Sequence, residues 1–121
     1  MMTGIRKDID NDYQKWTKDL ELFRQESALL KYRLSDMVDA DDGNVFLQKA
    51  EYFQNELLLK DEWLKKLIPE VQYYKDVAEN KLHLPKKINA LHNKLQKDIS
   101  KFEKQFLILS KEFNEQMLQH F

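Results

Sequence analysis

The chain has 121 residues, of which 42% are hydrophobic and 34% are charged, and its formal net charge is −1. Its two glycines and two prolines leave little material for turns, which excludes a β-sandwich or an enzyme built from many loops. The chain is too apolar and too aromatic for a disordered tail. Its balanced charge provides no overall attraction to nucleic acid or to an anionic membrane. We expect one domain that spans residues 1–121.

Cysteine is absent, which excludes disulfides, thiol catalysis and thiolate metal sites and fits a reducing cytoplasm, the location that we expect. The segment from Met1 to Asp12 contains three aspartates and no apolar run, so it does not resemble a signal peptide. The longest aliphatic and aromatic run, from Phe106 to Leu109, is far too short to cross a membrane. A soluble protein without a membrane partner is therefore predicted.

The first helix is predicted from about residue 5 to residue 40. Its apolar residues recur at alternating spacings of four and three, which is a heptad repeat and predicts one buried helix face, here called the seam. The turn signal Asp41-Asp42-Gly43-Asn44 follows, and Gly43 can adopt the left-handed conformation that ends a helix. The seam of this helix comprises Ile9, Tyr13, Trp16, Leu20, Phe23, Ser27, Leu30, Leu34 and Met37.

The second helix is predicted from about residue 45 to residue 79, with Asn44 as its cap. Its seam continues in phase on both sides of Pro69, although a proline there removes one backbone hydrogen bond and clashes with the carbonyl of Lys65. We therefore predict one helix with a kink at Pro69, and a break at Ile68-Pro69 is the alternative. The seam comprises Phe46, Ala50, Phe53, Leu57, Lys60, Leu64, Leu67, Val71, Tyr74 and Ala78.

The third helix is predicted from about residue 85 to residue 119. The second turn signal, residues 80–85, ends in Pro85, and proline is favoured at the first helical position. Its seam contains two places where two steps of four follow each other, which relaxes the supercoil toward straight helices. The seam comprises Ile88, Leu91, Leu95, Ile99, Phe102, Phe106, Leu109, Phe113 and Met117.

Three segments of similar length with short connections predict antiparallel neighbours. The predicted fold is all-α, an antiparallel up-down-up three-helix bundle of coiled-coil type. In general architecture it resembles spectrin-like repeats, without a family motif that would transfer functional residues. The equal lengths also predict that residues near 29, 58 and 108 meet at one height of the bundle.

No catalytic constellation stands out, so we predict neither an enzyme nor a cofactor. Asp39, Asp41, Gly43 and Glu51 approach a calcium-loop pattern, but the glycine falls one position early and the glutamate one position late. A helix-capping turn is the favoured interpretation. None of the three histidines has the Glu-x-x-His spacing of di-iron bundles, and no metal site is expected.

Ser27 and Lys60 are polar residues within the first and second seams, at about the same height. The favoured interpretation is a buried polar layer that sets the register of the helices, with the lysine stem reaching toward solvent. The alternative is a desolvated lysine with a lowered pKa that is poised for chemistry. The sequence offers no acid–base partner for that role.

Four lysines of the third segment recur at spacings of three and four, so they share one helix face. The favoured interpretation is charge pairing with the first segment, where Asp12, Asp19 and Glu26 recur every seven residues. A basic face for nucleic acid is the alternative, although such faces normally interleave aromatic residues and the third segment contains no arginine. This basic ridge comprises Lys94, Lys97, Lys101 and Lys104.

Apolar residues exceed what a narrow seam requires, above all at mid-height. The runs 28–30, 57–59 and 106–109 each cover more than half of a helix circumference. Scattered surface apolar residues are normal, whereas a contiguous patch marks an interface, which is the interpretation that we favour. The candidate interface residues are Leu22, Leu29, Tyr32, Tyr52, Leu58, Leu59, Trp63, Tyr73 and Ile108.

The favoured hypothesis is a non-catalytic interaction or scaffolding module that forms a homodimer or binds a partner helix through these off-seam faces. The alternative is a nucleic-acid-binding helical module that uses the basic ridge. An enzyme is the least favoured class, because a straight bundle makes a poor cleft unless a ligand lies between the helices. Such a ligand would lie near Trp16, Phe23, Phe53 or Trp63.

Overall fold

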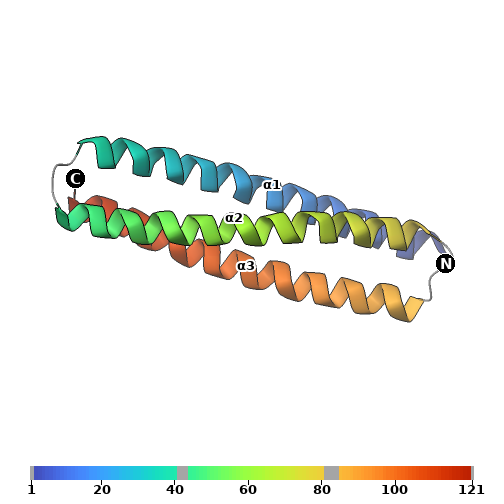
Figure 1. Cartoon of the computed structure of the whole chain (residues 1–121). Helices are drawn as coiled ribbons and strands as arrows, with labels where there is room; N and C mark the ends of the chain where they lie inside the picture. The colour runs from blue at the N-terminus through green and yellow to red at the C-terminus, as the bar shows by residue number, and fades with distance from the viewer. Residues whose placement is uncertain (1, 41–43, 81–84, 121) are drawn as a thin grey trace.

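The computed structural model of the chain contains three long helices that pack against each other (Figure 1). Helix α1 spans Met2–Ala40, α2 spans Asn44–Glu79 and α3 spans Pro85–His120. The structure describes the backbone of residues 2–40, 44–80 and 85–120 and the side chains of residues 11–39, 47–80 and 85–117. Within these ranges every element is a helix and none is a strand, which confirms the all-α class. None of the three helices, over the residues described, is both long enough and apolar enough to cross a bilayer.

The helices lie side by side along one long axis, with the N-terminus at one end of the molecule and the C-terminus at the other (Figure 1). Helix α2 packs along both α1 and α3, whereas α1 and α3 approach each other closely at few points. Helix α2 is therefore the central element. The looser approach of α1 to α3 leaves a groove between them at mid-height.

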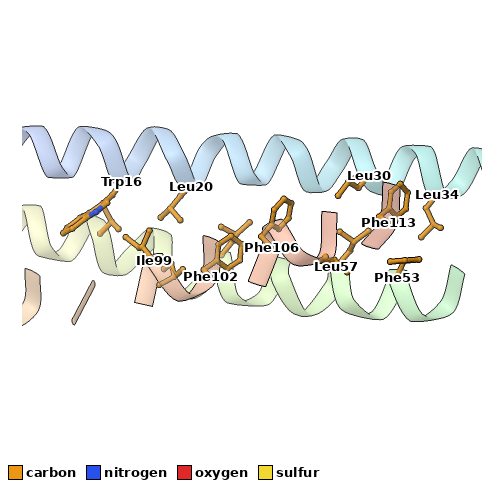
Figure 2. Packing of buried hydrophobic residues seen from close by; sticks show 14 of the residues in the cluster. Trp16, Leu20, Leu30, Leu34, Phe53, Leu57, Ile99, Phe102, Phe106 and Phe113 are labelled. Carbon is orange, nitrogen blue, oxygen red and sulfur yellow. The ribbon is translucent and has the colours of Figure 1, made fainter. Parts of the chain in front are cut away.

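The core is built from the three seams (Figure 2). Phe102 is 0% exposed, and its ring stacks on that of Phe106 with the ring centroids 5.8 Å apart. Phe23 contacts both rings from α1, at centroid distances of 5.4 and 5.2 Å. Full burial of each such side chain stabilises the fold by about 1.5–3 kcal/mol. Every seam residue whose side chain is described is buried or partly buried, and Val77, which the seam did not include, is buried as well.

Contacts between α1 and α2 define the register of the two helices. The Tyr13 hydroxyl donates a hydrogen bond to Gln72 Oε1 at 3.0 Å, and the Ser27 hydroxyl donates one to Asp61 Oδ1 at 2.8 Å. Higher residue numbers in α1 therefore face lower residue numbers in α2. The residues near 29, 58 and 108 lie at one height, as their distances from the turn signals predict, because Ser27 meets Asp61 here and Leu29 shares a groove with Leu107 of α3.

Helix α2 continues through Pro69 without interruption, so the alternative of a break at Ile68-Pro69 is wrong. Pro69 is exposed to solvent. Asn44 is the first residue of α2, and α1 already begins at Met2. Residues 41–43 and 81–84, which include Gly43 and His83, lie outside the described residues.

Candidate interaction surface

The candidate interface residues of the sequence are exposed in the structure, with one exception. Trp63 is only partly exposed, since its indole packs edge-on against Phe102 at a centroid distance of 5.2 Å and contacts the core. The exposed members are Leu22, Leu29, Tyr32, Tyr52, Leu58, Leu59, Tyr73 and Ile108. Three further large apolar side chains are exposed that the sequence argument did not select, namely Leu47, Ile68 and Leu107. Leu107 was within reach of that argument, because it belongs to the apolar run of residues 106–109.

The groove between α1 and α3 gathers part of these side chains at one place. Leu22 and Leu29 line it from α1, Leu107 lines it from α3, and the aromatic rings of Phe23 and Phe106 form its floor. Its volume is about 430 Å³. The two leucines of α1 are each 51% exposed and Leu107 is 56% exposed. About half of each side chain therefore stays in contact with water. The groove is also lined by the polar side chains of Gln25, Glu26 and Ser110. An apolar floor with exposed leucines around it is the arrangement expected of a docking surface.

Two grooves lie between α2 and α3, with volumes of about 400 and 170 Å³, and the smaller one lies at mid-height. Tyr52 and Ile108 line it together with the charged side chains of Glu56, Lys60 and Glu112. The Tyr52 hydroxyl donates a hydrogen bond to Glu112 Oε2 at 3.1 Å. Burial, followed by this hydrogen bond to a carboxylate, raises the pKa of Tyr52. This groove is more polar than the one between α1 and α3, because three charged side chains line it and the hydroxyl of its tyrosine is hydrogen-bonded to one of them.

The polar seam residues Ser27 and Lys60 have side-chain partners in the structure. Ser27 is 1% exposed and Lys60 is 6% exposed, so both seam positions are buried. Asp61 of α2 accepts the hydrogen bond from Ser27 and also forms an ion pair with Lys31. Lys60 forms an ion pair with Glu56 on its own helix, with a separation of 3.5 Å between Nζ and Oε2. Ser27 therefore contacts the residue next to Lys60, and the lysine ammonium already has a carboxylate partner.

The basic ridge is exposed, and its expected pairing with α1 is not found among the described residues. Lys94, Lys97, Lys101 and Lys104 are all exposed, and no ion pair among the described residues joins any of them to α1. The spacing shows that these lysines share a face of α3, but the side of α3 that faces α1 is a different one and carries Leu107 and Ser110. Phe102, the aromatic residue within the ridge, is completely buried and offers no ring for base stacking.

One acidic residue of α1, Asp12, contacts a histidine of α3. Asp12 Oδ2 lies 2.6 Å from His92 Nε2, and the His92 ring packs on Trp16 at a centroid distance of 5.1 Å. His92 is thus a partly buried link between α3 and α1. The side chain of His120 lies outside the described residues. In the described part of the chain, no three His, Cys, Asp or Glu side chains gather closely enough to hold a metal ion.

Comparisons with known proteins identify no relative. No protein-family model matches the chain, and neither a curated protein nor a solved structure is significantly similar to it. The function must therefore be argued from the residues of the surface itself, of which the exposed leucines of the α1/α3 groove are the most distinctive.

Proposed function

We propose that this protein is a non-catalytic interaction module that self-associates through its exposed apolar side chains at mid-height. The observation that carries the proposal is the α1/α3 groove, where Leu22, Leu29 and Leu107 are exposed around an aromatic floor. Covering such side chains removes apolar surface from water, which is the main driving force of protein association. Self-association is the simplest form, because a two-fold contact requires no second protein.

The scaffold that we propose for this role is an up-down-up bundle of coiled-coil type, with α2 bent at Pro69. The alternating spacing of three and four between its buried residues supports this scaffold. The interior proline supports the bend, since proline removes a backbone hydrogen bond and clashes with the preceding turn. A stiff scaffold of this kind holds its exposed side chains at constant positions, which suits a binding surface because little conformational freedom is lost on association.

Size-exclusion chromatography with light scattering tests the proposed function. We expect a dimer at micromolar concentration and a shift toward monomer in Leu29→Glu, because a buried carboxylate in an apolar contact is costly. Asn55→Glu, which adds the same charge at an exposed polar position of α2, is the matched control and should leave the dimer unchanged. A monodisperse wild-type monomer that none of these changes affects would refute the proposal.

A further inference from the structure

A second heptad pattern runs along the outward side of α1, opposite its seam. The positions alternate in steps of three and four, and all eight side chains are exposed. Any face of a helix has this spacing, so what distinguishes this one is its residues: three large apolar side chains are exposed near its centre and charged side chains lie at its two ends. We call this set the outer seam, and it comprises Lys15, Lys18, Leu22, Gln25, Leu29, Tyr32, Asp36 and Asp39.

The charges of the outer seam match those of a second copy that runs in the opposite direction. Two lysines stand at its N-terminal end, two aspartates stand at its C-terminal end, and apolar side chains dominate its centre. Lys15 and Asp39 lie twelve residues on either side of Ser27, and Lys18 and Asp36 lie nine residues on either side of it. A second copy packed antiparallel about the Ser27 level would therefore place a lysine opposite an aspartate at all four charged positions. A parallel copy would instead place lysine against lysine and aspartate against aspartate.

The apolar centre is matched by the same two-fold operation. Leu22 would lie opposite Tyr32 of the second copy, and Leu29 opposite its Gln25, so the aliphatic and aromatic side chains meet within the charged ends. Leu107 of α3 is exposed directly beside this centre, across the α1/α3 groove, and widens the apolar contact. At ~1.5 Å per residue, the stretch from Lys15 to Asp39 is about 36 Å long.

The four charges have no partner within the described chain that would compete with a second copy. Other exposed charges on the surface form local ion pairs, such as Arg24 with Glu21 and Lys65 with Glu62. Among the described residues, neither lysine nor either aspartate of the outer seam forms an ion pair. These four charges are therefore free to pair with a second copy, and their order along α1 would select its direction.

We propose that a second copy of this chain docks antiparallel along the outer seam of α1, about a two-fold axis at the level of Ser27. The inference rests on the proposed self-association and adds the face and the direction. Charge order selects the antiparallel arrangement, and the leucines and Tyr32 supply the buried area. The basic ridge and the α2/α3 grooves remain outside the contact.

Charge reversal tests the inference. Lys15→Asp with Lys18→Asp makes all four charges of the outer seam negative, and Asp36→Lys with Asp39→Lys makes all four positive. We expect each double variant to dimerise at least about tenfold more weakly than wild type in sedimentation equilibrium, because four attractive pairs become repulsive. The quadruple variant restores the antiparallel order and should dimerise as wild type does. An equimolar mixture of the two double variants should form a heterodimer.

Lys101→Asp with Lys104→Asp is the matched control, since it changes the same charge at the same spacing on the exposed face of α3. It should dimerise like wild type, and circular dichroism should show equal helix content in all variants. A dimer that the control weakens as much as the α1 reversals, or a quadruple variant that stays as weak as the double variants, would overturn the docking face and leave self-association intact. A wild-type monomer would overturn both.

Discussion

Tyr74 is buried between the rings of Trp16 and His92, at centroid distances of 5.4 and 5.9 Å. Burial, and to a smaller extent the negative charge of Asp12, raises the pKa of Tyr74 to about 12 from the ordinary 10.0. The folded chain therefore keeps the phenolic proton at a pH where the unfolded chain has lost it. The resulting contribution to stability is complete below pH 10 and is lost as the pH rises toward 12.

Tyr74→Phe isolates this effect. Between pH 10 and 12, we expect the free energy of unfolding of wild type to fall by up to about 2–3 kcal/mol more than that of the variant. Urea denaturation at intervals across this range measures the difference. Lysines titrate in the same range but do so equally in both proteins, so two parallel curves would contradict the predicted role of Tyr74.

Asp61 holds the polar layer together, because it accepts a hydrogen bond from Ser27 and pairs with Lys31. Asp61→Ala would leave the buried Ser27 hydroxyl without this acceptor, and we expect a loss of about 1–3 kcal/mol in the free energy of unfolding. Glu62→Ala is the matched control, since the exposed pair of Glu62 with Lys65 should contribute less than about 0.5 kcal/mol. Chemical denaturation of both variants decides the matter, and equal losses would count against a structural role for the layer.

At the level of the helix, Pro69 is the residue of the α2 interior that local helix preference opposes most strongly. An interior proline costs a helix roughly 3 kcal/mol relative to alanine, and part of this cost is offset because proline also restricts the unfolded chain. We expect Pro69→Ala to raise the free energy of unfolding by about 1–3 kcal/mol. Lys66→Ala, at another exposed position of α2, should change it by only a few tenths, and a similar small change in both would show that α2 accommodates Pro69 without strain.

Each helix face was predictable because its apolar period is a local property of the chain. Phe102, Phe106 and Phe113 occupy the seam of α3 at helical spacing, and all three are buried. The pattern of α2 passes through Pro69 in phase, and the helix does the same. At the end of α2, Val77 is more deeply buried than the seam residue Ala78. This change of buried position was not predictable, because both residues lie near the edge of the seam and the position of the facing helix decides which one it covers.

For the molecule as a whole, the heights of residues were easier to predict than their directions around the bundle. Distances from the turn signals place the middle of the three helices together, and Ser27 does meet Asp61 at this height. The pairing of the basic ridge with α1 failed, because spacing shows which lysines share a face and not which neighbour that face meets. The same arrangement leaves the leucines of the α1/α3 groove exposed.

The sequence by itself determined three helices, their approximate ends and the face that each one buries, because heptad spacing acts within a single helix. It also contains the charge order of the outer seam, which can act in the proposed dimer only because that side of α1 is exposed. Only the tertiary structure decided which flank of each helix meets which neighbour: His92 lies against Asp12, and Leu107 lies beside Leu22 and Leu29. The physical reason is that one periodic pattern permits more than one arrangement of three helices around a shared core, and contacts between distant residues select among them.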